Sequence, residues 1–120
     1  MLALILCVAL AAGNGGGASQ VTRVFPADGS KAEAIAAVGA ELNFAAGPPV
    51  DVKSLRLLLD GQDVTPRATT TMTRDWPPSQ VSISYAPGPL KPGIHRAEVR
   101  FRPERGKEVV HRWQFSVTQP

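Results

Sequence analysis

The chain has 120 residues, 43% of them hydrophobic, which is enough apolar material for one globular core and too little length for a second sizeable domain. Aromatic residues make up only 6%, whereas the chain contains 11 prolines and 11 glycines, so its composition favours short strands joined by turns over long helices. The formal net charge of +3 is too small to indicate a nucleic-acid-binding protein by itself.

The first twelve residues, MLALILCVALAA, carry no charge. Their apolar run is about eleven residues long, which fits the apolar region of a secretory signal peptide and is shorter than the roughly 18–20 residues of a membrane span. The small residues predict cleavage after Ala11 or Ala12. Because this segment lacks a lysine or arginine, two alternatives stay open: an uncleaved hydrophobic anchor, or a translation start upstream of Met1.

Cys7 is the single cysteine of the chain and lies within this apolar run. Lipidation of Cys7 is disfavoured, because Leu6 stands where a lipoprotein carries a small residue. Removal of residues 1–12 therefore leaves a mature chain without thiols or disulfides. Residues 13–20, GNGGGASQ, have the composition of a flexible linker, which leaves residues 21–118 as the folded domain.

Seven runs of strand-forming residues follow, separated by turn signals at the spacing of about 8–12 residues that is typical of a β-sandwich. In chain order they are residues 21–25, 37–44, 53–65, 68–73, 81–85, 95–102 and 109–117. The third run contains Asp60-Gly61, a dipeptide that accepts the positive φ angles of a tight hairpin turn. Gly106 lies in a second predicted hairpin turn, between the last two runs.

Successive side chains of a strand point to opposite faces, so the alternate positions that are apolar identify the face of each run that packs on the core. The predicted core positions are Val38, Ala40, Leu42, Phe44, Leu55, Leu57, Leu59, Val81, Ile83, Tyr85, Ala97, Val99, Phe101, Val109, Trp113, Phe115 and Val117. A helix over residues 31–42 competes with the second run, since alanine and glutamate favour helix there. Gly39 and the later alternation weaken that alternative, although a short helical turn before the strand stays open.

Four motifs occur in the order FPADGS, SLRLLLDGQDVT, YAPGPLKPGIHRAEVRF and WQFSV. In this order they resemble bacterial immunoglobulin-like (Ig-like) domains of exported and cell-surface proteins, over residues 21–117. The resemblance implies an all-β, seven-stranded antiparallel Ig-like sandwich that acts as an accessory, spacer or binding module without catalysis. It places His95 at the corner where other sandwiches carry a tyrosine that hydrogen-bonds back to the main chain.

No nucleophile, phosphate-loop or thiol-redox motif occurs in the sequence, so we expect no enzyme and no cofactor. His95 and His111 fall on strands predicted to be neighbours, and two imidazoles can share a metal ion. No third ligand is evident, so no metal site is assigned, and weak metal binding stays an alternative. Asp60 and Asp63 supply two carboxylates where calcium needs about six to eight oxygens, so a hairpin is preferred.

Basic residues gather in one part of the chain: residues 91–112 hold seven basic and three acidic residues, a net charge of +4, which leaves −1 for the rest. If the runs 53–65, 95–102 and 109–117 form one sheet, five arginines project together from its outer face: Arg56, Arg96, Arg100, Arg102 and Arg112. Guanidinium groups bind sulfate, phosphate and uronate groups bidentately. The alternative is a solvated face that maintains solubility.

Trp76 lies in the predicted loop WPPSQ, where an exposed indole can stack on a sugar ring. The alternative is an indole that caps one end of the core. Together with the five arginines, Trp76 completes the predicted ligand-binding residues.

These observations predict a periplasmic or extracellular, non-enzymatic binding or structural module of the bacterial cell envelope. Its expected partner is an envelope polysaccharide or another envelope protein. The first alternative is carbohydrate or anionic-polymer binding through the basic sheet face, and the second is a weak metal-binding periplasmic protein. Nucleic acid is not expected as a partner, and membrane contact is expected only through an uncleaved N-terminal segment.

Overall fold

The computed structural model describes residues 20–45 and 47–118. In chain order its elements are β1 (Val21–Phe25), β2 (Lys31–Ala32), β3 (Val38–Asn43), β4 (Val50–Leu59), β5 (Gln62–Asp63), the 3-10 helix η2 (Thr65–Arg67), β6 (Thr69–Met72), β7 (Gln80–Tyr85), β8 (Gly93–Pro103) and β9 (Val109–Val117). The predicted signal segment and residues 13–19 of the predicted linker lie outside the described residues. Gln20 belongs to the folded part, because it is buried and its carbonyl accepts a hydrogen bond from the Asn43 amide.

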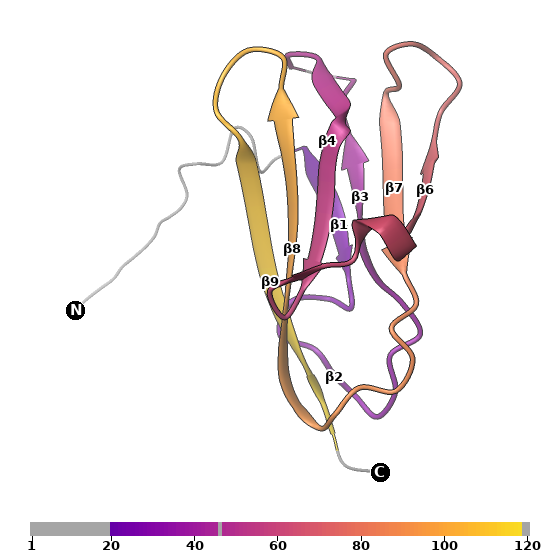
Figure 1. Ribbon diagram of the computed structural model, residues 1–120, viewed down its shortest axis with the longest axis vertical. Coiled ribbons are helices and arrows are strands. Elements are labelled where there is room, and N and C mark those ends of the chain that lie inside the picture. The colour runs from indigo at the N-terminus through magenta and orange to yellow at the C-terminus, as the bar shows by residue number, and fades with distance from the viewer. Residues whose placement is uncertain (1–19, 46, 119–120) are drawn as a thin grey trace, which may run out of the picture.

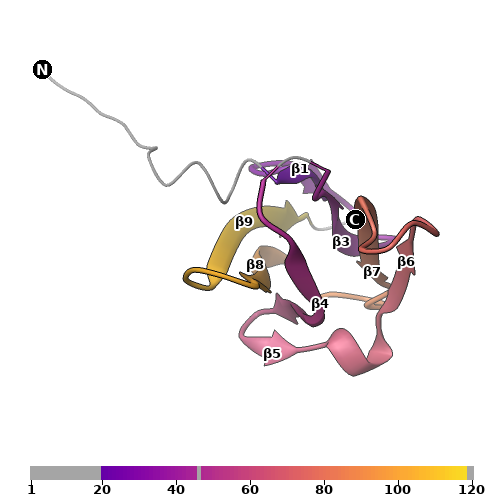
Figure 2. The same cartoon turned by 90° about the horizontal axis from the view of Figure 1, so that it is seen from above.

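The strands form two sheets, in the orders β1-β3-β7-β6 and β2-β9-β8-β4-β5. The sheets lie face to face in both views of the molecule (Figures 1 and 2), which confirms the all-β, two-layer fold. All seven predicted runs contain a strand. Within the described part of the chain, no helix has the length and apolar character that a membrane crossing requires.

The predicted count of seven strands is wrong, because two additional strands, β2 and β5, bring the count to nine. Each is two residues long, too short for alternation to appear in the sequence. β5 is the far arm of the Asp60-Gly61 hairpin and ends where buried Val64 turns into the core. The sandwich is also not wholly antiparallel, since β2 runs parallel to β9.

The helix considered for residues 31–42 is wrong, because those residues contain β2, an irregular connection and most of β3. Gly39 provides the physical reason for the strand. A Cβ atom at this position would overlap the carbonyl oxygen of Ile83 and lie 2.7 Å from the Phe25 ring. Only glycine permits β3 to approach its neighbours this closely.

Alternate residues of each long strand meet between the sheets, as the parity predicts. All of the predicted core positions are buried except Tyr85 and Val109, which are partly buried against the core. Trp113 is 3% exposed, which confirms it as a core residue. Its indole Nε1 has no hydrogen-bond partner among the described residues, so this buried donor reduces the stability gained from the ring.

The Asp60-Gly61 turn is confirmed by its backbone, since both residues have positive φ angles, 51° and 83°. Asp60 is not glycine, and its left-handed conformation is supported by hydrogen bonds that reach a neighbouring strand. Its amide donates to the carbonyl of Arg96, and its carboxylate Oδ1 accepts from the Arg96 amide at 2.9 Å. The turn is therefore fastened to β8.

Candidate functional site

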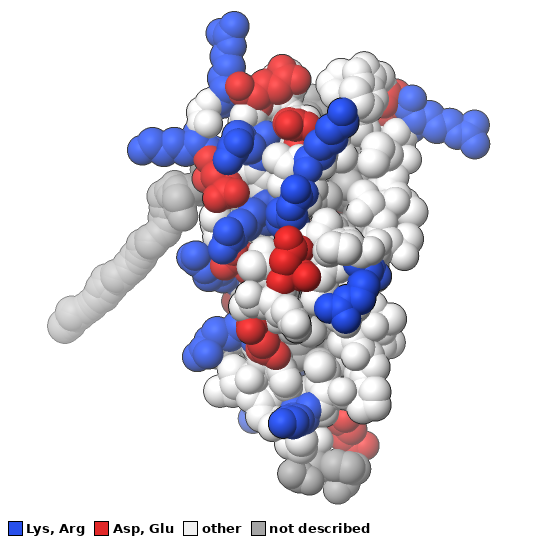
Figure 3. Space-filling view, in the orientation of Figure 1, with Lys and Arg blue, Asp and Glu red and all other residues white. Residues whose placement is uncertain are grey.

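The outer face of the β9-β8-β4 sheet carries most of the predicted site. These three strands are neighbours, as the sequence predicts, and outward positions alternate with core positions along β8. Figure 3 shows charged side chains gathered over β9, β8 and β4, whereas the side of the molecule formed by β7 and β6 is largely uncharged. The predicted arginines nevertheless divide into three groups with different surroundings.

At the centre of this face, Glu98 joins two arginines. Glu98 lies directly opposite Arg112 on β9 and two residues before Arg100 on β8, so all three side chains share one face. Arg112 Nε donates to Glu98 Oε1 at 2.7 Å, and Arg100 Nε donates to Oε2. We call these three residues the Glu98 cluster. The Glu98 side chain is 13% exposed, so the central carboxylate is largely covered by its own partners.

The arginines determine the charge state of Glu98. Burial raises the pKa of the carboxyl group, but the hydrogen bonds and charges of Arg100 and Arg112 lower it by more, and the net shift of the pKa is downward. Glu98 is therefore ionised at neutral pH. Arg100, in turn, has its pKa raised by the hydrogen bond to Glu98.

Both guanidinium groups of the Glu98 cluster are held through Nε. Within the part of the chain that the structure describes, none of their Nη atoms takes part in a hydrogen bond. Arg96 lines the same groove, which has a volume of about 740 Å³ and also includes Asp28 and Gln114. The groove thus presents three arginines, two of them oriented by a carboxylate and open to a ligand at Nη.

Arg56 does not join this groove. Its Nη1 donates to the carbonyl oxygens of Lys53 and Leu55, at 2.9 and 2.8 Å, and its Nε lies 3.9 Å from Asp63 Oδ2. Arg56 lies directly opposite Arg100 on β8 and shares its outer face, but its guanidinium stabilises the bulged part of β4 and does not line the groove. No pattern in the sequence indicates this, because the contacts depend on the irregular register of β4 between Asp51 and Arg56.

Trp76 and Arg102 lie together in another place. They line a groove of about 570 Å³ with Lys53, Glu104 and the two prolines of the WPP motif. We call it the end groove, because the connection between β6 and β7 and the start of β4 lie at the same end of the sandwich (Figure 1). Trp76 is 83% exposed, so the alternative that it caps the core is wrong. Arg102 lies two residues after Arg100 on β8 and shares its outer face, but it lines the end groove and not the groove of the Glu98 cluster.

His95 hydrogen-bonds to the main chain, as its corner position implies: Nε2 donates to the Lys91 carbonyl at 2.7 Å. Its Nδ1 donates to Asp60 Oδ2 at 2.6 Å, and the ring stacks on Phe115. Both ring nitrogens face acceptors, so the ring is satisfied only as imidazolium. Burial lowers the pKa of His95, but Asp60 and Lys91 raise it by more, and the net shift is upward.

His111 is separated from His95 along the sheet. His95 pairs with Phe115 in the ladder, whereas His111 pairs with Val99, a separation of four residues or roughly 13 Å. The two imidazoles therefore do not form the shared metal site considered from the sequence. Burial lowers the pKa of His111, so its ring is neutral at pH 7. Among the described residues, no group of three His, Cys, Asp or Glu is arranged to hold a metal ion.

The two aspartates considered for calcium fix the hairpin instead. The carboxylate of Asp60 accepts from His95 and from the Arg96 amide. Asp63 Oδ1 accepts from the Thr65 amide at 2.9 Å, and hydrogen bonds from Thr65 lower the pKa of Asp63. These local donors favour the hairpin interpretation over a calcium site.

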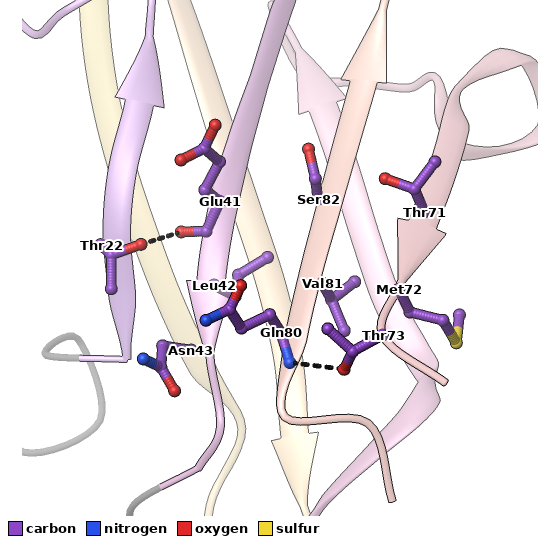
Figure 4. Close-up of a pocket in the computed structure, with 10 residues that line it drawn as sticks. All are labelled: Thr22, Glu41, Leu42, Asn43, Thr71, Met72, Thr73, Gln80, Val81 and Ser82. Carbon is purple, nitrogen blue, oxygen red and sulfur yellow. Dashed lines mark hydrogen bonds between the residues drawn. The ribbon is translucent and has the colours of Figure 1, made fainter. Parts of the chain in front are cut away.

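The opposite sheet carries a groove that sequence reasoning did not identify. Its volume is about 570 Å³, and Figure 4 shows its lining on four strands: Thr22, Glu41, Leu42, Asn43, Thr71, Met72, Thr73, Gln80, Val81 and Ser82. The exposed groups are hydroxyls and amides, one carboxylate and the side chain of Met72, which is 45% exposed. Each strand supplies only one to three of these residues. The only signal in the sequence is that polar residues occupy alternate positions of these strands, on the side that faces solvent.

No protein-family model matches the sequence, and no curated protein matches it. Among solved structures, the chain is similar in fold to a crystal structure of selenomethionine PcoC, a copper resistance protein from Escherichia coli. The TM-score is 0.51 and the identity 19%, over 82% of this chain and 98% of PcoC. A second crystal structure, of PcoC described as a methionine rich copper resistance protein, gives a TM-score of 0.49 and 20% identity, over 82% and 97%.

Proposed function

We propose that this chain is an Ig-like, non-enzymatic binding module exported to the cell envelope, and that it binds the anionic groups of an envelope polysaccharide through Arg96, Arg100 and Arg112. The observation that carries the proposal is the Glu98 cluster, in which one carboxylate orients two guanidinium groups and leaves their Nη atoms open. Carboxylate, sulfate and phosphate groups match that arrangement, because each offers two oxygens to a guanidinium edge.

The Glu98 cluster also lowers the cost of binding. A free arginine side chain loses up to about 2 kcal/mol of conformational entropy when it is immobilised. Arg100 and Arg112 are already restrained by Glu98, so a smaller part of that cost arises when a ligand binds. The outer end of each guanidinium remains in solvent, so we expect binding that weakens as salt increases.

The test is binding of the exported protein to immobilised alginate, dextran sulfate and neutral dextran, at low and at high salt. We expect retention on the two anionic polymers at low salt, and its loss at high salt. The variant Arg100→Lys/Arg112→Lys keeps the charge and removes the bidentate edge. We expect its affinity for the anionic polymers to fall about tenfold.

The matched control is Arg23→Lys/Arg67→Lys, at arginines that lie on β1 and on η2, away from the Glu98 cluster. We expect this control to bind as the unaltered protein does. Equal binding by both lysine variants would show that charge alone is recognised and that the Glu98 cluster is not a site. Absence of binding to both anionic polymers would leave a structural spacer as the function.

Copper binding is the second candidate, because the fold resembles that of a copper resistance protein. The observation in this chain that favours it is His111, whose imidazole is kept neutral and forms no hydrogen bond within the described residues. The chain contains only two methionines, Met1 and Met72, so thioether ligands are scarce. Calorimetric titration with Cu(II) tests this candidate: His111→Gln is expected to abolish a saturable site, and absence of heat in the unaltered protein rejects it.

A further inference from the structure

Trp76 is the most exposed large apolar side chain of the described residues, at 83%, whereas Trp113 is 3% exposed. An indole offers a large apolar face with one polar edge, and side chains of this kind are frequent at binding sites. The other exposed large hydrophobic residues, Met72 and Ile94, do not line the end groove. Trp76 is therefore the single aromatic side chain that lines the end groove, beside Val50, Val52 and three prolines.

The loop that carries Trp76 is closed by hydrogen bonds at its base. Thr73 Oγ1 accepts from the amides of Ser79 and Gln80, at 3.0 and 3.2 Å, and donates to Asp75 Oδ1. Asp75 Oδ1 also accepts from the Ser79 amide at 3.2 Å. The loop also contains two prolines, which restrict the main chain beside the indole. The main chain that carries Trp76 is thus largely organised before a ligand binds.

The opposite wall of the end groove is equally fixed. The Arg102 amide donates to Ser54 Oγ at 2.7 Å, and this hydroxyl donates to the Asp51 carbonyl at 2.6 Å. Asp51 Oδ1 accepts from the Lys53 amide at 3.0 Å. These bonds lie where the register of β4 and β8 shifts, and such irregularities change the direction of side chains at the end of a strand.

The charges around the end groove balance. Two acidic residues, Asp51 and Glu104, and two basic residues, Lys53 and Arg102, line it, so their formal charges sum to zero. A pyranose ring has an apolar face of C–H groups that can stack on an indole. Its rim consists of hydroxyl groups, which donate to carboxylates and accept from lysine and arginine. The volume of about 570 Å³ also lies in the range of ligand pockets.

From this combination we propose that the end groove is a second binding site, for a neutral pyranose unit of an oligosaccharide stacked on Trp76. This site does not depend on the anion site of the Glu98 cluster, because no residue is shared between the two grooves. An acidic sugar is less well matched, since half of the charged groups at this end are carboxylates.

Tryptophan emission of the exported protein tests the proposal. The probes are cellohexaose, maltohexaose and the hexamer of N-acetylglucosamine, added at high salt so that binding to the arginines is screened. We expect at least one of them to shift the Trp76 emission to shorter wavelength in a saturable manner and to protect it from acrylamide. Trp76→Ala should abolish the response, and Arg102→Ser should reduce the affinity several-fold.

Two control variants distinguish sugar binding in the end groove from loss of fold and from binding at the Glu98 cluster. Trp76→Ala should keep the melting temperature of the unaltered protein, because the side chain is exposed, so loss of response is not loss of fold. Arg100→Ser/Arg112→Ser should keep the response to the neutral sugar even if it loses binding to alginate. Absence of any shift with all three hexamers overturns the proposal, as does an emission shift that follows protein concentration without sugar, which would assign Trp76 to self-association.

Discussion

The inner faces of the two sheets form one core, whereas their outer faces offer different chemistry to solvent. On the β9-β8-β4 face, Glu98 is 13% exposed and joins two arginines. On the β1-β3-β7-β6 face, Glu41 is 45% exposed and pairs with one arginine, Arg23, at 3.0 Å, among hydroxyl and amide groups (Figure 4). The same alternation of residues builds both faces. The alternation along a strand therefore predicts which side chains face solvent. Whether such a side chain can form an organised site depends on its neighbours on the adjacent strands.

The largest effects on the free energy of unfolding are expected in the core, to which both sheets contribute in the same way. Leu57 and Leu42 come from opposite sheets, and both are buried in the core. Leu57→Ala and Leu42→Ala should each lower the free energy of unfolding by about 3 kcal/mol, because each leaves a cavity in a close-packed interior. Urea denaturation measures both. A loss below about 1 kcal/mol for either variant would show that one sheet is loosely packed and that the two sheets already differ in the core.

The next largest effect on the free energy of unfolding is expected for His95, which lies on β8. His95→Gln should lower the free energy of unfolding by about 2 kcal/mol at acidic pH, because it removes a charged hydrogen bond to Asp60. The folded-state pKa of His95 is raised above its ordinary value of 6.5. Its contribution is therefore complete below pH 6.5 and is lost as the pH rises through the folded pKa. Urea denaturation at about pH 5.5 and about pH 9 should show the difference from the unaltered protein shrinking; a constant difference argues against the imidazolium.

A smaller effect on the free energy of unfolding is expected for Glu98, and it should distinguish the outer face of β9-β8-β4 from that of the other sheet. Glu98→Gln should lower the free energy of unfolding by about 1 kcal/mol at about pH 7, since two arginines lose their anionic partner while remaining partly solvated. The pKa of Glu98 is below its ordinary value of 4.5. Its contribution is present above pH 4.5 and disappears as the pH falls through the folded pKa. Thermal unfolding between about pH 7 and about pH 3 measures this, and a difference that grows towards acid would contradict it.

The smallest effect is expected for the corresponding carboxylate of the other face. Glu41→Gln should change the free energy of unfolding by about 0.3 kcal/mol, because the pair with Arg23 is solvent-exposed on both sides. Thermal unfolding, as for Glu98→Gln, measures this change. If Glu41→Gln and Glu98→Gln have equal effects, the contrast between an organised cluster and an ordinary surface pair fails.

Sequence reasoning succeeded where a physical rule acts along one strand. Parity identified the core residues from Val38 to Val117, and Asp60-Gly61 identified the hairpin, because both depend on local geometry. It also placed three arginine-bearing strands in one sheet. The expected hydrogen bond from His95 to the main chain is present, with the Lys91 carbonyl as its acceptor.

Sequence reasoning failed where the surroundings of a side chain depend on residues far away in the sequence. The Nδ1 partner of His95 is Asp60, 35 residues away, and the Ser54 hydroxyl that fixes Arg102 is 48 residues away. Arg56 and Arg102 lie on the expected outer face, but Arg56 hydrogen-bonds to main-chain carbonyl groups of β4 and Arg102 lines the end groove. The central position of Glu98 depends on β9, which places Arg112 directly opposite it.

Both grooves of the β9-β8-β4 sheet are carried by one strand, and this has a consequence for ligand length. Arg96 and Arg102 are six residues apart on β8, which corresponds to about 20 Å along a strand. A strand hydrogen-bonded on both sides cannot shorten or bend freely, so this interval is constant. If both proposed sites bind one oligosaccharide, a ligand shorter than this interval can occupy only one groove at a time, and an extended chain is needed to span both.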